Sequence, residues 1–71
     1  MNYKWFTADE AWDLLVNDYT LTTSYDWDWP RFSRCSDGAN KSYPEEEGIA
    51  EEYKTKEEFL KDVGDETFRI V

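Results

Sequence analysis

Residues 19–32 read YTLTTSYDWDWPRF, and the alternation of side chains in this stretch decides which fold we expect. One set of alternate positions carries mostly large side chains: Tyr19, Leu21, Thr23, Tyr25, Trp27 and Trp29. The set between them is polar: Thr20, Thr22, Ser24, Asp26 and Asp28. A period of two places the sets on opposite faces of a strand, and β-branched and aromatic residues favour strands. The stretch therefore predicts a strand over residues 19–28, with its rings in the core and its carboxylates in solvent.

Two amphipathic helices are predicted on either side of this strand. Each begins with a threonine followed three residues later by a glutamate, the spacing of a capping box: Thr7 with Glu10, and Thr55 with Glu58. Apolar residues then recur at helical spacing, which gives each segment one face for the core. We expect helices over residues 8–17 and 56–63.

The rest of the chain adds short strands and loops. Residues 32–35 and 67–71 are expected to be strands, and residues 36–44 are loop-like in composition. Residues 45–53 are ambiguous, because Ile49, Ala50 and Tyr53 have helical spacing but Gly48 weakens a helix that begins earlier. The predicted architecture is a single α+β domain over residues 1–71, with two helices packed on one face of a small antiparallel sheet of three to four strands.

Aromatic residues are expected to supply the core of this small domain. The 71 residues include four Trp, five Tyr and four Phe. Each buried ring removes roughly 150–250 Å² from water, so a few rings can fill a core. Cys35 is the one cysteine, so no disulfide within the chain can assist, and a lone cysteine suits a reducing compartment.

Enzyme and metal motifs are not found in the sequence. The absence of histidine excludes Ser-His-Asp and Cys-His arrangements, and three isolated glycines make no phosphate-binding loop. Asp26 and Asp28 begin like a calcium loop, but Trp29 and Pro30 stand where oxygen ligands and a turn glycine belong. On one strand face these two carboxylates also do not flank a substrate as glycosidase carboxylates do. We expect no catalysis, no cofactor and no metal.

The net charge of −9 is the strongest functional signal. Acids are concentrated in residues 1–30 and 42–66, whereas residues 31–41 are net basic. So negative a protein repels nucleic acid and anionic membranes, and we expect neither as a direct ligand. A macromolecular partner is expected to be basic.

A very short, acidic, aromatic-rich α+β chain with one cysteine resembles the small inhibitors encoded by phages and other mobile elements. That group includes anti-CRISPR proteins and DNA mimics that block host nucleases. The resemblance lies in size and composition. It implies an inhibitor that occupies the positively charged nucleic-acid-binding groove of a host defence nuclease in the host cytoplasm, and excludes nucleic acid by competition.

Candidate partner-binding residues follow from the acidic pattern. Asp26 and Asp28 are expected about 6.7 Å apart on one strand face, close to the ~6.8 Å rise of two nucleotides. Clustered glutamates add negative charge, and an exposed tyrosine is a typical interface anchor. The predicted contact residues are Asp26, Asp28, Glu45, Glu46, Glu47, Glu51, Glu52 and Tyr43.

Alternatives to this function remain open. One is an antitoxin-like regulator that binds a basic protein without mimicking nucleic acid. Another is a small module that stacks Tyr25, Trp27 and Trp29 on a sugar or peptide, which conflicts with rings predicted in the core. The acidic surface can also be a solvated one with no partner.

The expected state is a monomer, or a weak homodimer paired through a terminal strand at a sheet edge. The chain has no apolar run long enough for a membrane span and no signal-peptide pattern at residues 1–5. We therefore expect a cytoplasmic protein.

Overall fold

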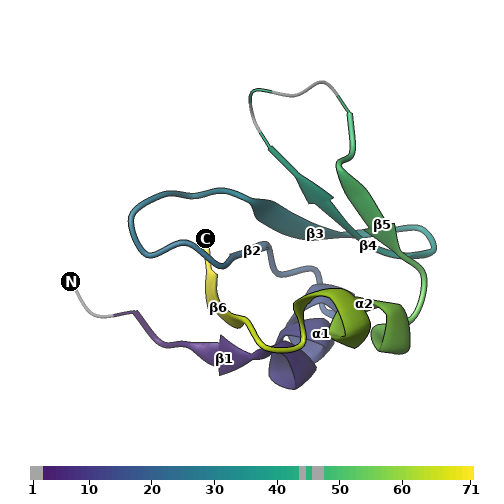
Figure 1. The fold of residues 1–71 in the computed structure, drawn as a ribbon, viewed down its shortest axis with the longest axis horizontal. Helices are drawn as coiled ribbons and strands as arrows, with labels where there is room; N and C mark the ends of the chain where they lie inside the picture. The colour runs from purple at the N-terminus through teal and green to yellow at the C-terminus, as the bar shows by residue number, and fades with distance from the viewer. Residues whose placement is uncertain (1–2, 44, 46–47) are drawn as a thin grey trace.

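The computed structural model describes residues 3–43, 45 and 48–71, and these form an α+β fold (Figure 1). The elements are β1 (Phe6–Thr7), α1 (Ala8–Val16), β2 (Leu21–Thr22), β3 (Arg31–Cys35), β4 (Gly38–Ser42), β5 (Glu51–Tyr53), α2 (Lys56–Val63) and β6 (Thr67–Ile70). In the described part of the chain, six strands form one antiparallel sheet in the order β1-β6-β2-β3-β4-β5. The predicted sheet of three to four strands is therefore wrong.

Both predicted helices are confirmed. At α1 the full capping box is present, because the Glu10 N–H donates to Thr7 Oγ1 and the Thr7 N–H donates to Glu10. At α2 the Glu58 N–H donates to Thr55 Oγ1, but the Glu58 carboxylate accepts from the backbone N–H of Lys54 and not from that of Thr55. Local capping chemistry thus fixes where each helix begins.

The extra strands come from short segments with little strand character of their own. β1 has two residues, and β4 lies in residues 36–44, which were predicted as a loop. β4 is held by pairing with β3 on one side and β5 on the other. Gly38, which suggested a loop, permits this contact: its φ is +132°, and a Cβ there would lie 2.0 Å from the carbonyl oxygen of Tyr53. Tertiary pairing here overrides local propensity.

The C-terminal strand is confirmed as β6, but it does not lie at an edge. β6 pairs with β1 on one side and β2 on the other. Its position removes the exposed terminal edge on which the homodimer hypothesis rested.

The core lies where the two helices meet the sheet, and Phe59 is at its centre. The Phe59 ring lies 5.3–6.0 Å, centroid to centroid, from four other rings: Trp12, Phe32, Tyr53 and Phe68. We call Phe32, Tyr53, Phe59 and Phe68 the core rings; all four are buried. α1 contacts β3, β4 and β6, while α2 contacts β5 and α1, so both helices cover the same core (Figure 1).

Of the predicted strand over residues 19–28, only Leu21–Thr22 form a strand. Leu21 is buried as expected, but Tyr25 and Trp27 are 60% and 63% exposed. The Ser24 N–H donates to Thr22 Oγ1, and the Trp27 N–H donates to Ser24 Oγ. The hydroxyls assigned to the polar face of a strand instead bond backbone N–H groups, and this turns the chain into a loop. We call residues 23–30 the β2–β3 loop; its Trp29–Pro30 peptide bond is cis.

Candidate functional site

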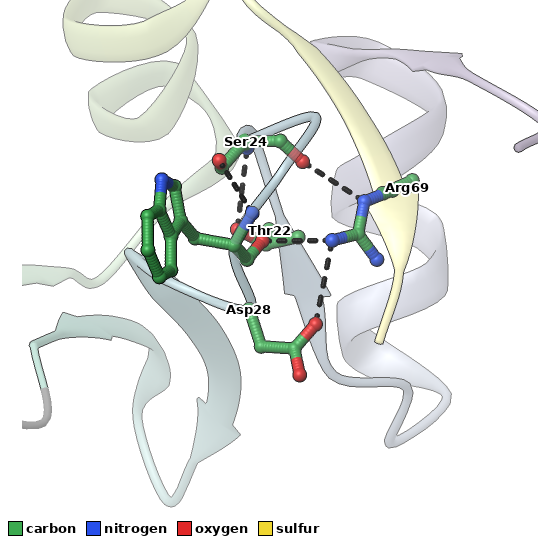
Figure 2. Close-up of polar contacts among 5 residues, drawn as sticks. Thr22, Ser24, Asp28 and Arg69 are labelled. Carbon is green, nitrogen blue, oxygen red and sulfur yellow. Dashed lines mark hydrogen bonds and ion pairs between the residues drawn. The ribbon is translucent and has the colours of Figure 1, made fainter.

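Arg69 on β6 holds the β2–β3 loop in place. Its side chain is buried, with the residue 4% exposed. Nε donates to the carbonyl oxygen of Ser24 at 2.9 Å, and Nη2 donates to that of Trp27 at 2.7 Å and to Asp28 Oδ1 at 3.3 Å (Figure 2). One guanidinium therefore satisfies backbone acceptors that a strand would have paired in a ladder.

A small aromatic layer covers Arg69. Side chains alternate along β6, so Arg69 faces away from the core that Phe68 enters. Its guanidinium carbon lies 4.1 Å from the centroid of the Tyr3 ring. Trp5 stacks on Tyr25 with 6.1 Å between centroids and 8° between planes, and Tyr3 contacts both rings edge-on. Tyr25 thereby ties the loop to the N-terminal segment.

The loop and the end of β4 form a hollow that we call the aromatic cleft. Its walls are the rings of Trp27, Trp29 and Tyr43, which are shared by two adjoining hollows of about 310 Å³ and about 260 Å³. The two indole rings have centroids 6.1 Å apart and planes inclined at 43°. The larger hollow is also lined by Asp28, Arg31 and Ser42, and the smaller by Glu45.

Charges of both signs surround the aromatic cleft. Asp28 pairs with Arg69, yet its side chain is 65% exposed and so faces solvent as well. Arg31 is exposed and lines the same hollow as Asp28. Lys41 Nζ lies 5.6 Å from the centroid of the Tyr43 ring. The smaller hollow, beside Glu45, is the acidic part of the cleft.

A separate hollow, which we call the acidic hollow, lies between β5 and α2, away from the aromatic cleft. It has a volume of about 410 Å³ and is lined by Glu51, Glu52, Tyr53, Glu58, Lys61 and Asp62. The Tyr53 hydroxyl donates to Asp62 Oδ2 at 2.6 Å. Burial, followed by this hydrogen bond and the Asp62 charge, raises the pKa of Tyr53 well above its usual range. Tyr53 therefore stays protonated beneath this group of carboxylates.

The predicted contact residues divide between these two places. Asp28, Tyr43 and Glu45 line the aromatic cleft, whereas Glu51 and Glu52 line the acidic hollow. Asp26 is exposed on the β2–β3 loop and lines neither. Glu46 and Glu47 lie outside the described residues. The expectation that Asp26 and Asp28 share a strand face is wrong, because residues 23–28 form no strand.

Sequence reasoning placed Trp27 and Trp29 in the core and missed Arg69. A usable signal was the run of Thr and Ser before the rings, since these residues favour turns as well as strands. Another was residue type, because Trp and Tyr carry a polar atom that favours partly wet sites. Arg69 gave no signal, since its partners are some 40 residues away.

No protein-family model, curated protein or solved structure matches this chain. Within residues 3–43, 45 and 48–71, no group of three or more potential metal ligands is arranged around a common centre. Neither helix of that described part has the length and apolar character needed to cross a membrane.

Proposed function

We propose that this protein acts by binding a basic partner protein, with the aromatic cleft as its main contact. The observation that carries the proposal is the exposure of Trp27, which is 63% exposed on a loop held by Arg69. Trp29 of the same loop and Tyr43 after β4 line the cleft beside it. Large exposed rings are typical of binding surfaces, and tryptophan and tyrosine are frequent binding hot spots. Because Arg69 already fixes the loop, binding orders few additional groups.

The charge supports a basic partner. A net charge of −9 attracts a cationic surface over several ångströms and speeds its approach. Asp28 and Glu45 place carboxylates at the cleft itself. Electrostatic attraction thus brings the partner to the rings, and burial of the rings holds it there.

Affinity capture with matched variants tests this proposal. The wild type, Trp27→Ala and Tyr19→Ala are each used to capture proteins from host lysate over a series of salt concentrations. Tyr19 is a matched control because its ring is 46% exposed but does not line the cleft. We expect a defined basic protein that the wild type and Tyr19→Ala retain equally and that Trp27→Ala retains at least ten-fold less.

Two results contradict the proposal. In one, every captured protein is retained equally by all three chains. In the other, the captured set follows protein abundance and elutes at modest salt, as expected for non-specific charge.

A second candidate function is inhibition of a host defence nuclease by occupation of its nucleic-acid-binding groove. The acidic hollow supports it, because Glu51, Glu52, Glu58 and Asp62 surround one cavity with a single lysine among them. Such a surface can replace phosphates against Lys and Arg side chains and release the same counterions. The resemblance in size and composition to DNA-mimic inhibitors points to the same partner class.

Competition for DNA tests this second function. The protein is titrated against defence nucleases holding labelled DNA, at low and at high salt. We expect displacement at low salt that weakens at high salt, and that the double variant Glu51→Gln/Glu52→Gln displaces DNA less well. Undiminished DNA binding across a broad panel of nucleases contradicts it. If Trp27→Ala is the variant that loses displacement, the contact lies at the aromatic cleft instead.

A further inference from the structure

We infer that the aromatic cleft is a cage for one cationic side chain, and that its ligand is an arginine of the partner protein. The inference rests on the proposed function for its partner and adds the chemistry that the cleft recognises. Among the described residues, the hollow bounded by Trp27, Trp29, Tyr43 and Glu45 has three aromatic walls and one carboxylate, and none of these lining residues is basic. Aromatic faces around a carboxylate attract a cation by both ring quadrupole and charge.

The ring geometry excludes a flat group held between the two tryptophans. A planar ligand between parallel faces needs roughly 7 Å, twice the contact distance of about 3.5 Å. The Trp27 and Trp29 centroids are only 6.1 Å apart, and their planes diverge by 43°. A ligand in this hollow therefore lies beside the pair and not between its rings, and Tyr43 is a further wall of the same hollow. The end of a long side chain fits that position better than a sandwiched ring does.

Arginine matches the cleft better than lysine. A guanidinium is planar, so it can stack on a ring while its N–H groups donate to a carboxylate beside that ring. The same protein already contains this arrangement at Arg69, whose guanidinium lies against Tyr3 and donates to Asp28. A partner arginine on the Trp27 and Trp29 rings, with Glu45 as acceptor, repeats the arrangement from outside.

Two basic residues near the cleft oppose a cation and provide a diagnostic. Arg31 lines the larger hollow, and Lys41 Nζ lies 5.6 Å from the Tyr43 ring centroid. If the ligand is a cation, removal of the Arg31 charge strengthens binding by reducing repulsion. If the ligand is instead an anion or a sugar hydroxyl bonded to Arg31, the same change weakens binding. Arg31→Gln therefore separates the cationic ligand from the alternatives by the direction of the change.

The test uses blocked amino acids as ligands for the whole protein. Binding is monitored through the indole N–H resonances in NMR spectra. N-acetyl-arginine amide is compared with the corresponding amides of citrulline, lysine and trimethyl-lysine. Citrulline is the matched neutral control because it keeps the length and planarity of arginine. We expect arginine to shift the Trp27 and Trp29 resonances with at least ten-fold higher affinity than citrulline, and with higher affinity than either lysine form.

Variants locate the binding. Trp27→Ala and Glu45→Gln are each expected to weaken arginine binding at least three-fold and Arg31→Gln to strengthen it, whereas Tyr19→Ala, at an exposed ring outside the cleft, should leave it unchanged. Amide spectra confirm that each variant is folded. Equal binding of citrulline, stronger binding of trimethyl-lysine, or weaker binding by Arg31→Gln overturns the inference.

The outcomes also separate this inference from the proposed function. A partner that requires Trp27, combined with no preference for free arginine, removes the cage and leaves the partner-binding function standing. Arginine binding at the cleft without any Trp27-dependent partner supports the cage and removes the proposed partner-binding function.

Discussion

The core rings and the rings of the aromatic cleft differ in position, although the composition does not distinguish them. The core rings are buried, and Phe59 is 0% exposed, whereas Trp27 in the aromatic cleft is 63% exposed. Three of the four core rings are phenylalanines, which have no polar atom, while the cleft rings are tryptophan and tyrosine. A residue with an apolar body and a polar tip is stable at a half-wet site, where phenylalanine gains less. Ring type therefore says more about position than the number of rings does.

The two groups are also held differently. The core rings are fixed by side chains that pack against one another between the helices and the sheet. Of the cleft rings, Trp27 and Trp29 are carried by the β2–β3 loop, whose backbone is held by hydrogen bonds from Arg69. Damage to the core should therefore unfold the chain, and damage to the loop should remove binding from a chain that still folds.

The largest expected effect is that of Phe59→Ala. This change removes a fully buried ring that contacts four others, and it should lower the free energy of unfolding by about 3–5 kcal/mol. A 71-residue domain has little stability in reserve, so the variant should be largely unfolded at 25 °C. Urea unfolding followed by circular dichroism measures the effect. A loss below about 1 kcal/mol would contradict the assignment of Phe59 to the centre of the core.

Arg69→Ala is expected to have the next largest effect. It leaves the carbonyl oxygens of Ser24 and Trp27 without their donor and should cost about 2–3 kcal/mol. The same change should release the β2–β3 loop, so binding at the cleft should fall together with stability. Hydrogen exchange of residues 23–30 and urea unfolding measure the two effects. Arg69→Lys is the matched control: it keeps the charge, but one ammonium cannot reproduce the fork, so it should recover only part of the loss.

The sequence was sufficient to predict the elements that local chemistry determines. The capping residues Thr7 and Thr55 begin the two helices, and β6 forms within the residues predicted as the terminal strand. β4, with the sequence GANKS, has no local tendency to form a strand and is one because β3 and β5 pair with it. Such pairing depends on residues far apart in the chain, which a local pattern does not encode.

The candidate site was predicted in part and for partly wrong reasons. Tyr43, Asp28 and Glu45 were expected to contact a partner and do lie together at the aromatic cleft. Trp27 and Trp29 are not in the core, because the period of two that predicts a strand over residues 19–28 does not produce one beyond Thr22. The same hydroxyls that produce this period, those of Thr22 and Ser24, bond the backbone and form the turn. Arg69, which also donates to the loop backbone, lies on β6, far from the loop in the sequence.

Tyr53→Phe removes the hydroxyl of Tyr53, the one core ring that carries a polar atom. It removes the hydrogen bond to Asp62 and should cost about 1 kcal/mol at neutral pH. Because the pKa of Tyr53 is raised in the folded protein, its stabilising contribution is complete below pH 10, the usual pKa of tyrosine, and is lost as the pH rises further. Above pH 10 the unfolded tyrosine releases its proton and the folded one keeps it, so unfolding is favoured. Urea unfolding between pH 8 and pH 11 should show a smaller decline for Tyr53→Phe than for the wild type. If the free energy of unfolding falls equally in the two proteins, the group that titrates is not Tyr53.

Trp27→Ala should have the smallest effect on stability and still remove binding. Its ring is mostly in solvent, so its loss should change the free energy of unfolding by no more than about 0.5 kcal/mol. Tryptophan fluorescence locates the ring independently, because acrylamide should quench the wild type strongly and this variant less. Trp12→Phe is the matched control: Trp12 packs against Phe59 at the core, so its replacement should leave the quenchable emission in place. A Trp27→Ala loss near that of Phe59→Ala, or unchanged quenching, would mean that Trp27 belongs with the core rings. A small change in stability combined with lost binding would instead show that this chain keeps separate rings for folding and for recognition.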